Sequence, residues 1–181
     1  AFDDSVRGVE AGIRSILVAD EGLLWLVNQA RQRGKLPANL VVKGSAVLGV
    51  ANPLGVKLLQ DNGLDTINVA SDISLPRLAA MRQVLSIPLD LYIEGPDGLG
   101  GFTRYYEIAE IIRVAAPVYL KFGLRNAPNI YPSGVHLEAA AIATGRERVR
   151  RAAIGMELLA RAGVEFTASP VGAAGLGIPQ V

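Results

Sequence analysis

The sequence lacks cysteine altogether and has a single histidine, His136. A chain without cysteine has no disulfide framework, no thiol nucleophile and no thiolate ligand for zinc or an iron–sulfur cluster. One histidine also excludes a multi-histidine metal site. We therefore expect no iron–sulfur cluster, which leaves a divalent ion as the metal to consider; the cofactor is otherwise unknown.

Excess charge of one sign and long apolar runs are also missing. Eighteen Lys and Arg balance seventeen Asp and Glu, so the net charge of +1 offers no basic surface to nucleic acid. No apolar run reaches the ~18 residues that span a bilayer, and the start shows no signal-peptide pattern. We expect a cytoplasmic protein whose partner is a small molecule or peptide, not nucleic acid or a membrane. Because a helical pattern begins directly after Ala1, we also expect an incomplete or processed chain.

What the sequence does contain is typical of an α/β protein. Half of its residues are apolar and only 6% are aromatic, a balance typical of helices packed on a buried parallel sheet. A chain of 181 residues can bury a single core. We therefore expect one domain over residues 1–181.

Short apolar runs alternate with helical patterns along the chain. Strands are predicted at 15–19, 40–43, 66–69, 89–94 and in a run that ends at Lys121, with a further short strand at 164–167. Helices are predicted at 1–12, 23–34, 53–63, 75–85, from about Thr103, and at 146–163. This alternation predicts parallel βα repeats with right-handed crossovers.

Two architectures fit the repeat, a doubly wound sheet and a TIM-like barrel. The chain lacks the Gly-x-Gly-x-x-Gly turn that a dinucleotide-binding sheet shows after its first strand. A complete barrel typically needs ~200 residues or more. We expect the later five or six βα units of a TIM-barrel-like fold, that is, an incomplete barrel.

Polar residues follow several of the predicted strands. The carboxyl ends of parallel strands meet at one edge, so four side chains are expected around one mouth: Glu94, Asp97, Lys121 and Arg125. Glu94 would be partly desolvated there and is a candidate general acid/base, or a structural ion pair with Lys121 or Arg125. Lys121 is a candidate catalytic clamp for a carboxylate or phosphate, or a Schiff-base amine. Lys43 and Asn68 end their strands similarly and are candidates for substrate binding.

The glycine-rich loop 95–101 contains Asp97, a further candidate for substrate binding. Its backbone N–H groups could cradle a phosphate beside the following helix. A flexible turn or lid is the alternative.

A long loop, 124–138, follows Lys121, and loops of this length tend to be functional or mobile. It carries five polar side chains: Arg125, Asn126, Tyr131, His136 and Glu138. The first three are candidates for substrate binding. His136 is a candidate proton shuttle with Glu138, or the two could join Asp97 or Glu94 around a divalent ion, or His136 could be a surface residue.

Two helices carry expectations about packing. Trp25 is expected to pack against the sheet. The last helix is expected to bury a stripe formed by Val149, Ala153, Met156 and Leu159. Its charged run 146–151 is better explained by solvation and by pairing with Glu147 than by RNA contact.

Residues from about 40 to 95 resemble a known family. A strand and loop end in Asn52 before a helix, Gly63 precedes the next strand, and the run from Asp72 to Leu75 starts a further helix. The strand 89–94 then leads into Gly95. This order resembles the middle of the collagenase-like peptidase family, number thirty-two in the class of peptidases of unknown mechanism. The resemblance implies a TIM-like barrel, of which this chain would hold the later part.

The signature of that family is half present. Asp90, Tyr92 and Gly95 keep the spacing of Glu-x-Phe-x-x-Gly, whereas Gly98 and Tyr105 stand at the positions of its cysteines. In branches that hydroxylate RNA or quinone rings, those cysteines hold an iron–sulfur cluster, so the resemblance implies no cluster here. It is compatible with peptidase activity and transfers no catalytic residue.

Two functions follow from these expectations. The first is a hydrolase or lyase, peptidase-like by resemblance, that acts on a small polar or anionic substrate at a barrel mouth. The second is a non-catalytic barrel portion completed by a partner chain or a second copy, because an open parallel sheet leaves an edge uncovered.

Overall fold

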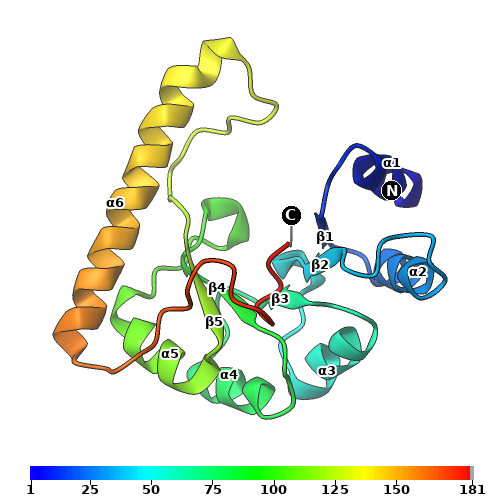
Figure 1. The fold of residues 1–181 in the computed structure, drawn as a ribbon. Helices are drawn as coiled ribbons and strands as arrows, with labels where there is room; N and C mark the ends of the chain where they lie inside the picture. The colour runs from blue at the N-terminus through cyan, green and yellow to red at the C-terminus, as the bar shows by residue number, and fades with distance from the viewer. Residues whose placement is uncertain (180–181) are drawn as a thin grey trace.

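The computed structural model describes residues 1–179, which form one parallel sheet with helices between its strands (Figure 1). The strands are β1 (Ser15–Val18), β2 (Val41–Gly44), β3 (Thr66–Asn68), β4 (Leu89–Glu94) and β5 (Val118–Phe122). The α-helices are α1 (Phe2–Glu10), α2 (Glu21–Gln32), α3 (Pro53–Asp61), α4 (Leu75–Arg82), α5 (Ile108–Ala115) and α6 (Glu138–Ala162). Four 3₁₀ turns complete them: η1 (Ala46–Leu48), η2 (Asp97–Leu99), η3 (Tyr105–Glu107) and η4 (Val135–Leu137). The predicted α/β class is confirmed.

The strands lie in the sheet in the order in which they occur along the chain, β1-β2-β3-β4-β5. A doubly wound sheet reverses its strand order at a switch point, whereas a barrel adds each strand beside the last. The order is therefore that of a barrel portion. Among residues 1–179, β1 and β5 do not pair with each other, so the sheet is open.

One face of the sheet packs on the helices and forms the apolar core. Val42, Ile67 and Leu91 point to this side and are buried with side chains such as Leu78 of α4 and Ile111 of α5. Burying a side chain of this size contributes about 1.5–3 kcal/mol. The opposite face carries polar side chains, and we call it the inner face.

Local signals explain where the helices begin. The Asn52 side chain accepts a hydrogen bond from the Gly55 N–H at 2.8 Å, and Pro53 occupies the first turn of α3. Asp20 caps α2 in the same way through the Leu23 N–H. Trp25, however, is exposed, because the face of α2 that packs on the core carries Leu24 and Val27, and Trp25 lies outside that face. Its predicted packing on the sheet is wrong.

Helix α6 begins at Glu138, eight residues before the predicted start, and runs along the outside of the sheet (Figure 1). It docks through Thr144, Gly155 and Leu159. A Cβ atom at Gly155 would lie 2.6 Å from the Phe122 ring, so the missing side chain is what admits the ring. This contact turns Val149, 71% exposed, and Met156, 46% exposed, toward solvent. The predicted buried stripe is therefore wrong except for Leu159.

Residues 164–179, which we call the C-terminal segment, pass across the inner face of the sheet (Figure 1). The Tyr119 hydroxyl donates to the Leu176 carbonyl oxygen at 2.8 Å. Gly177 touches β3 so closely that a Cβ atom there would overlap the Thr66 methyl group. Residues 164–167 lie in the described part of the chain and form no strand, so that prediction is wrong. The rest of the tail had no predicted pattern, and its residues 180–181 lie outside the described residues.

No helix within residues 1–179 is long and apolar enough to cross a membrane.

Candidate functional site on the inner face

Polar side chains from four strands share the inner face. Strand register and alternation place them together, since paired residues of neighbouring strands point to the same side. Lys43 pairs with Thr66, Asn68 with Asp90, Asp90 with Tyr119, and Tyr92 with Lys121. We call these side chains the Lys121 cluster: Lys43, Thr66, Asn68, Asp90, Tyr92, Tyr119 and Lys121.

Lys121 is held by two neighbours on this face. Its ammonium group donates a hydrogen bond to Asn68 Oδ1 and lies 4.4 Å from the centre of the Tyr92 ring. Asn68 is itself oriented, because its Nδ2 donates to the Gly44 carbonyl oxygen at 2.8 Å. The amide oxygen accepts the hydrogen bond of the ammonium group, and the ring face attracts the cation.

Lys43 reaches toward the other end of the cluster. Its ammonium group lies 5.5 Å from the centre of the Tyr119 ring. Burial raises the pKa of Tyr119, and the negative charge of Asp90 raises it further. Within residues 1–179, neither Lys43 nor Lys121 forms an ion pair with a carboxylate. The inner face thus carries two ammonium groups, neither of which is within ion-pair distance of a carboxylate of residues 1–179.

Two buried groups on the same face have no hydrogen-bond partner within the described residues. They are Asp90 Oδ2 and Thr66 Oγ1. Asp90 is 7% exposed and Thr66 is fully buried. Buried polar atoms are nearly always partnered, so two orphans on one face require an explanation.

Glu94 points to the opposite side of the sheet. A β-bulge between Tyr92 and Glu94 shifts the register, so Glu94 lies opposite Phe122 rather than on the side of Lys121. Phe122 packs against Tyr105 and α6, which identifies this as the helix-facing side. The expectation that Glu94 and Lys121 lie around one mouth is therefore wrong. The sequence pattern alone does not predict the bulge that separates them.

The Glu94 carboxylate is almost completely buried and fully occupied by the protein. It accepts hydrogen bonds from the Tyr105 hydroxyl at 2.6 Å and the Arg125 backbone N–H at 3.1 Å, and pairs with Arg151 at 3.5 Å. Burial and then Glu94 raise the pKa of Tyr105 to about 12. The predicted ion pair of Glu94 exists, but its partner is Arg151 of α6, not Lys121 or the Arg125 side chain.

The charged run of α6 supports this link. Arg150 and Arg151 hold Glu147 at 2.7 Å and lower its pKa to about 2, with Arg150 the larger cause. The predicted pairing with Glu147 is confirmed. It positions Arg151 between two carboxylates, Glu94 and Glu147.

Asp97, Arg125 and Asn126 form a separate cluster at the rim. Asp97 accepts from the Asn126 backbone N–H at 2.6 Å and from Arg125 Nε at 3.2 Å. The Asn126 N–H is the larger cause of the lowered pKa of Asp97, followed by Arg125. The cluster fastens the loop after β5 to the loop 95–101, and within residues 1–179 no hydrogen bond joins it to the Lys121 cluster.

Several backbone N–H groups of the loop 95–101 donate hydrogen bonds to carbonyl oxygens nearby in the chain. Gly95 N donates to the Phe102 carbonyl oxygen at 2.8 Å, Gly100 N to Asp97 at 3.0 Å and Gly101 N to Pro96 at 3.2 Å. These three donors are not available to a phosphate, which favours the turn over the anion cradle.

Tyr131 and His136 are not brought to the inner face. Both are exposed, and the Tyr131 N–H bonds within its own loop to Asn129 Oδ1 at 3.1 Å. Among residues 1–179, no three histidine or acidic side chains gather as a metal ion would require. The alternative of a divalent ion at His136 and Glu138 is therefore not supported by the geometry.

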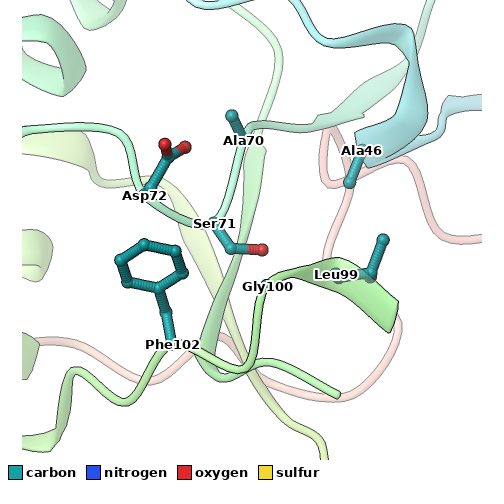
Figure 2. A pocket seen from close by; sticks show the side chains of 7 residues that line it. All are labelled: Ala46, Ala70, Ser71, Asp72, Leu99, Gly100 and Phe102. Atoms are coloured by element: carbon teal, nitrogen blue, oxygen red, sulfur yellow. The ribbon is translucent and has the colours of Figure 1, made fainter. Parts of the chain in front are cut away.

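A cavity of about 240 Å³ opens at the carboxyl ends of β2, β3 and β4. Figure 2 shows its lining, which comes from η1, the loop after β3 and the loop after β4: Ala46, Ala70, Ser71, Asp72, Leu99, Gly100 and Phe102. Buried Arg104 fixes one wall by donating to the Ser71 carbonyl oxygen at 3.3 Å and to Glu107 at 2.5 Å. Asn68 ends β3 two residues before Ala70, so the cavity directly follows the Lys121 cluster along β3.

Four members of the cluster are not among the site residues that the sequence predicts: Thr66, Asp90, Tyr92 and Tyr119. Tyr119 precedes Lys121 by two residues, Thr66 precedes Asn68 by two, and Asp90 lies two before Tyr92. Counting backwards by two along each predicted strand would have found them. Arg151 gave no signal, since its partner depends on how α6 docks.

No family model and no curated protein matches this sequence. Among solved structures, the chain is similar to the YdjI aldolase from Escherichia coli K12, with 17% sequence identity and a TM-score of 0.47. The alignment covers 87% of this chain and 61% of the aldolase chain, so the chain spans less than two thirds of that protein's length. We therefore infer function from the residues of the inner face.

Proposed function

We propose that this chain binds a small anionic molecule at the inner face and cleaves it, as a hydrolase or lyase. The observation that carries the proposal is the pair of ammonium groups, Lys43 and Lys121, without a carboxylate partner in residues 1–179. A partly buried cation is costly unless an anion or oriented dipoles offset its lost hydration. A substrate carboxylate or phosphate would provide that anion.

Lys121 is the proposed catalytic clamp. Asn68 and the Tyr92 ring fix its position. A fixed cation in a site shielded from water stabilises negative charge that develops during bond cleavage. A Schiff base formed by the same amine stays the alternative prediction for Lys121.

The cavity that follows Asn68 along β3 offers room for part of such a substrate. Its volume of about 240 Å³ is below the range typical of drug-sized ligands and suits a small metabolite or a short peptide end. Ser71 and Asp72 supply polar contacts, whereas Leu99 and Phe102 supply apolar walls. The cavity is at the carboxyl edge, where barrel enzymes carry their sites.

We further propose that the chain is a divergent relative of the collagenase-like peptidases. Two of the three signature positions kept here, Asp90 and Tyr92, lie on the inner face beside Lys121, which supports the assignment. Tyr105, at a cysteine position of the family, is instead hydrogen-bonded to Glu94 on the helix-facing side.

Replacing Lys121 by Met tests the proposal. Methionine keeps most of the volume and removes the charge, so the affinity for succinate or inorganic phosphate should fall at least ten-fold in an NMR titration. Lys57→Met is the matched control, because Lys57 is on α3 and, among residues 1–179, forms its ion pair with Asp61 alone. Equal affinities of wild type and Lys121→Met would overturn the proposal.

Turnover is tested separately. The wild-type chain and Lys121→Met are incubated with a mixture of short peptides and small carboxylates, and products are followed by mass spectrometry. Products with the wild type alone would support cleavage. Anion binding without any product would reduce the proposed function to binding.

A barrel portion completed by another chain is the second candidate function. Leu17 of the edge strand β1 points to the inner face and is 62% exposed, which favours a partner there. Native mass spectrometry separates the two candidates. An obligate oligomer without affinity for succinate or phosphate would favour the second.

A further inference from the structure

The unpartnered atoms of the inner face suggest more than an anion. Among residues 1–179, Asp90 Oδ2 is an acceptor without a donor, and Thr66 Oγ1 has no hydrogen-bond partner. Leaving such a buried group unpaired is unfavourable, because it loses its hydration without gaining a partner. A ligand that donates hydrogen bonds to Asp90 would relieve that cost.

The positions of these groups relative to the lysines define the ligand. Asp90 pairs in register with both Asn68, which holds Lys121, and Tyr119, whose ring lies under Lys43. Thr66 pairs with Lys43 itself. One acidic group is thus flanked by two ammonium groups on a single face, and a complementary ligand carries a positive donor beside a negative end.

We propose that the inner face is a site for a small amino carboxylate, whose carboxylate is bound by Lys43 and Lys121 and whose ammonium group donates to Asp90. The proposal rests on the proposed function, since it assumes that the lysines bind an anion. It adds the substrate class: amino acids or the ends of short peptides. The Thr66 hydroxyl is the remaining partner for either end of the ligand.

Three matched pairs of probes test this assignment. Glycine, β-alanine and 4-aminobutyrate are compared with acetate, propionate and butyrate, which have the same carboxylates without the ammonium group. The three lengths sample the separation of the two charges. The side-chain amide signal of Asn68 reports binding beside Lys121 in an NMR titration of the full chain.

At least one amino carboxylate should bind ten-fold or more tightly than its matched carboxylate, because it gains a charge-assisted hydrogen bond. Asp90→Asn keeps the shape of the side chain and should abolish that preference while leaving the plain carboxylates bound. Lys121→Met should weaken both series. A thermal melt of each variant confirms that it is folded.

Three results would overturn the inference. Equal binding of the two series would refute it and leave the anion site standing. A preference that persists in Asp90→Asn would assign the ammonium group to another residue. Absence of any binding in the wild type would refute the proposed function together with the inference.

Discussion

At the scale of single residues, Glu94 is a structural carboxylate. It joins β4 to η3, to the loop after β5 and to α6. Glu94→Gln keeps its shape but removes the charge opposite Arg151, so the free energy of unfolding should fall by about 1–3 kcal/mol. Urea denaturation measures this loss. Affinity for succinate should be unchanged. A loss of affinity with unaltered stability would show that Glu94 takes part in ligand binding.

Tyr105 makes the same contact sensitive to high pH. Its pKa rises from 10.0 to about 12 in the folded chain, chiefly by burial and then through Glu94. Because the folded pKa is the higher one, the stability it contributes is complete below about pH 10 and is lost as the pH approaches 12. Urea midpoints measured across this range should fall in the wild type. The urea midpoint of Tyr105→Phe should fall less over the same pH range. An equal fall in the two proteins would contradict the assignment.

The inner-face residues show what the sequence can and cannot predict at this scale. Lys43, Asn68 and Lys121 were predicted because each ends a recognisable strand, and alternation places all three on one face. Glu94 was misplaced because a single bulge changes its side. Bulges are set by packing around the strand and leave no mark in so short a run.

At the scale of elements, α6 shows that the contact face of a helix can be chosen by a small residue. Gly155 admits the Phe122 ring, and Leu159 is buried on the same side. Leu159→Ala should therefore cost about 2–5 kcal/mol in the free energy of unfolding. Met156→Ala, on the exposed side, should change it by no more than about 0.5 kcal/mol. Urea denaturation of the pair checks the orientation, and the reverse order would refute it.

The strands and most helices could be predicted because their signals are local. Caps such as Asn52 and Asp20 and the apolar strand runs are visible in the sequence. The start of α6 was missed because its first eight residues, from Glu138, lack an apolar stripe. Those residues are helical by propensity, with four alanines among them.

At the scale of the whole molecule, the open sheet is covered on its inner face by the C-terminal segment. The order of strands could be predicted from the βα alternation. The covering segment could not be predicted, because residues 171–179, which include its contacts with the sheet, have no helical or strand periodicity. Its contacts are tertiary, from Tyr119 to Leu176 and from Thr66 to Gly177.

The C-terminal segment lies where the proposed ligand binds, so displacing it should open the site. Gly177 has a left-handed φ of 60°, and a Cβ atom there would overlap Thr66 and lie 3.1 Å from the Asp65 carbonyl oxygen. Gly177→Ala should therefore release the segment from β3. The amide of Leu176 and its neighbours should then exchange hydrogen faster than in the wild type.

Gly175→Ala separates release from backbone strain. Gly175 also has a left-handed φ, 75°, but a Cβ atom there would meet nothing within 4 Å. Both variants carry the strain of a side chain at positive φ, and only Gly177→Ala adds the clash with β3. Succinate should bind several-fold more tightly to Gly177→Ala than to Gly175→Ala in an NMR titration. Faster exchange without tighter binding would show that the segment covers the sheet without competing for the ligand.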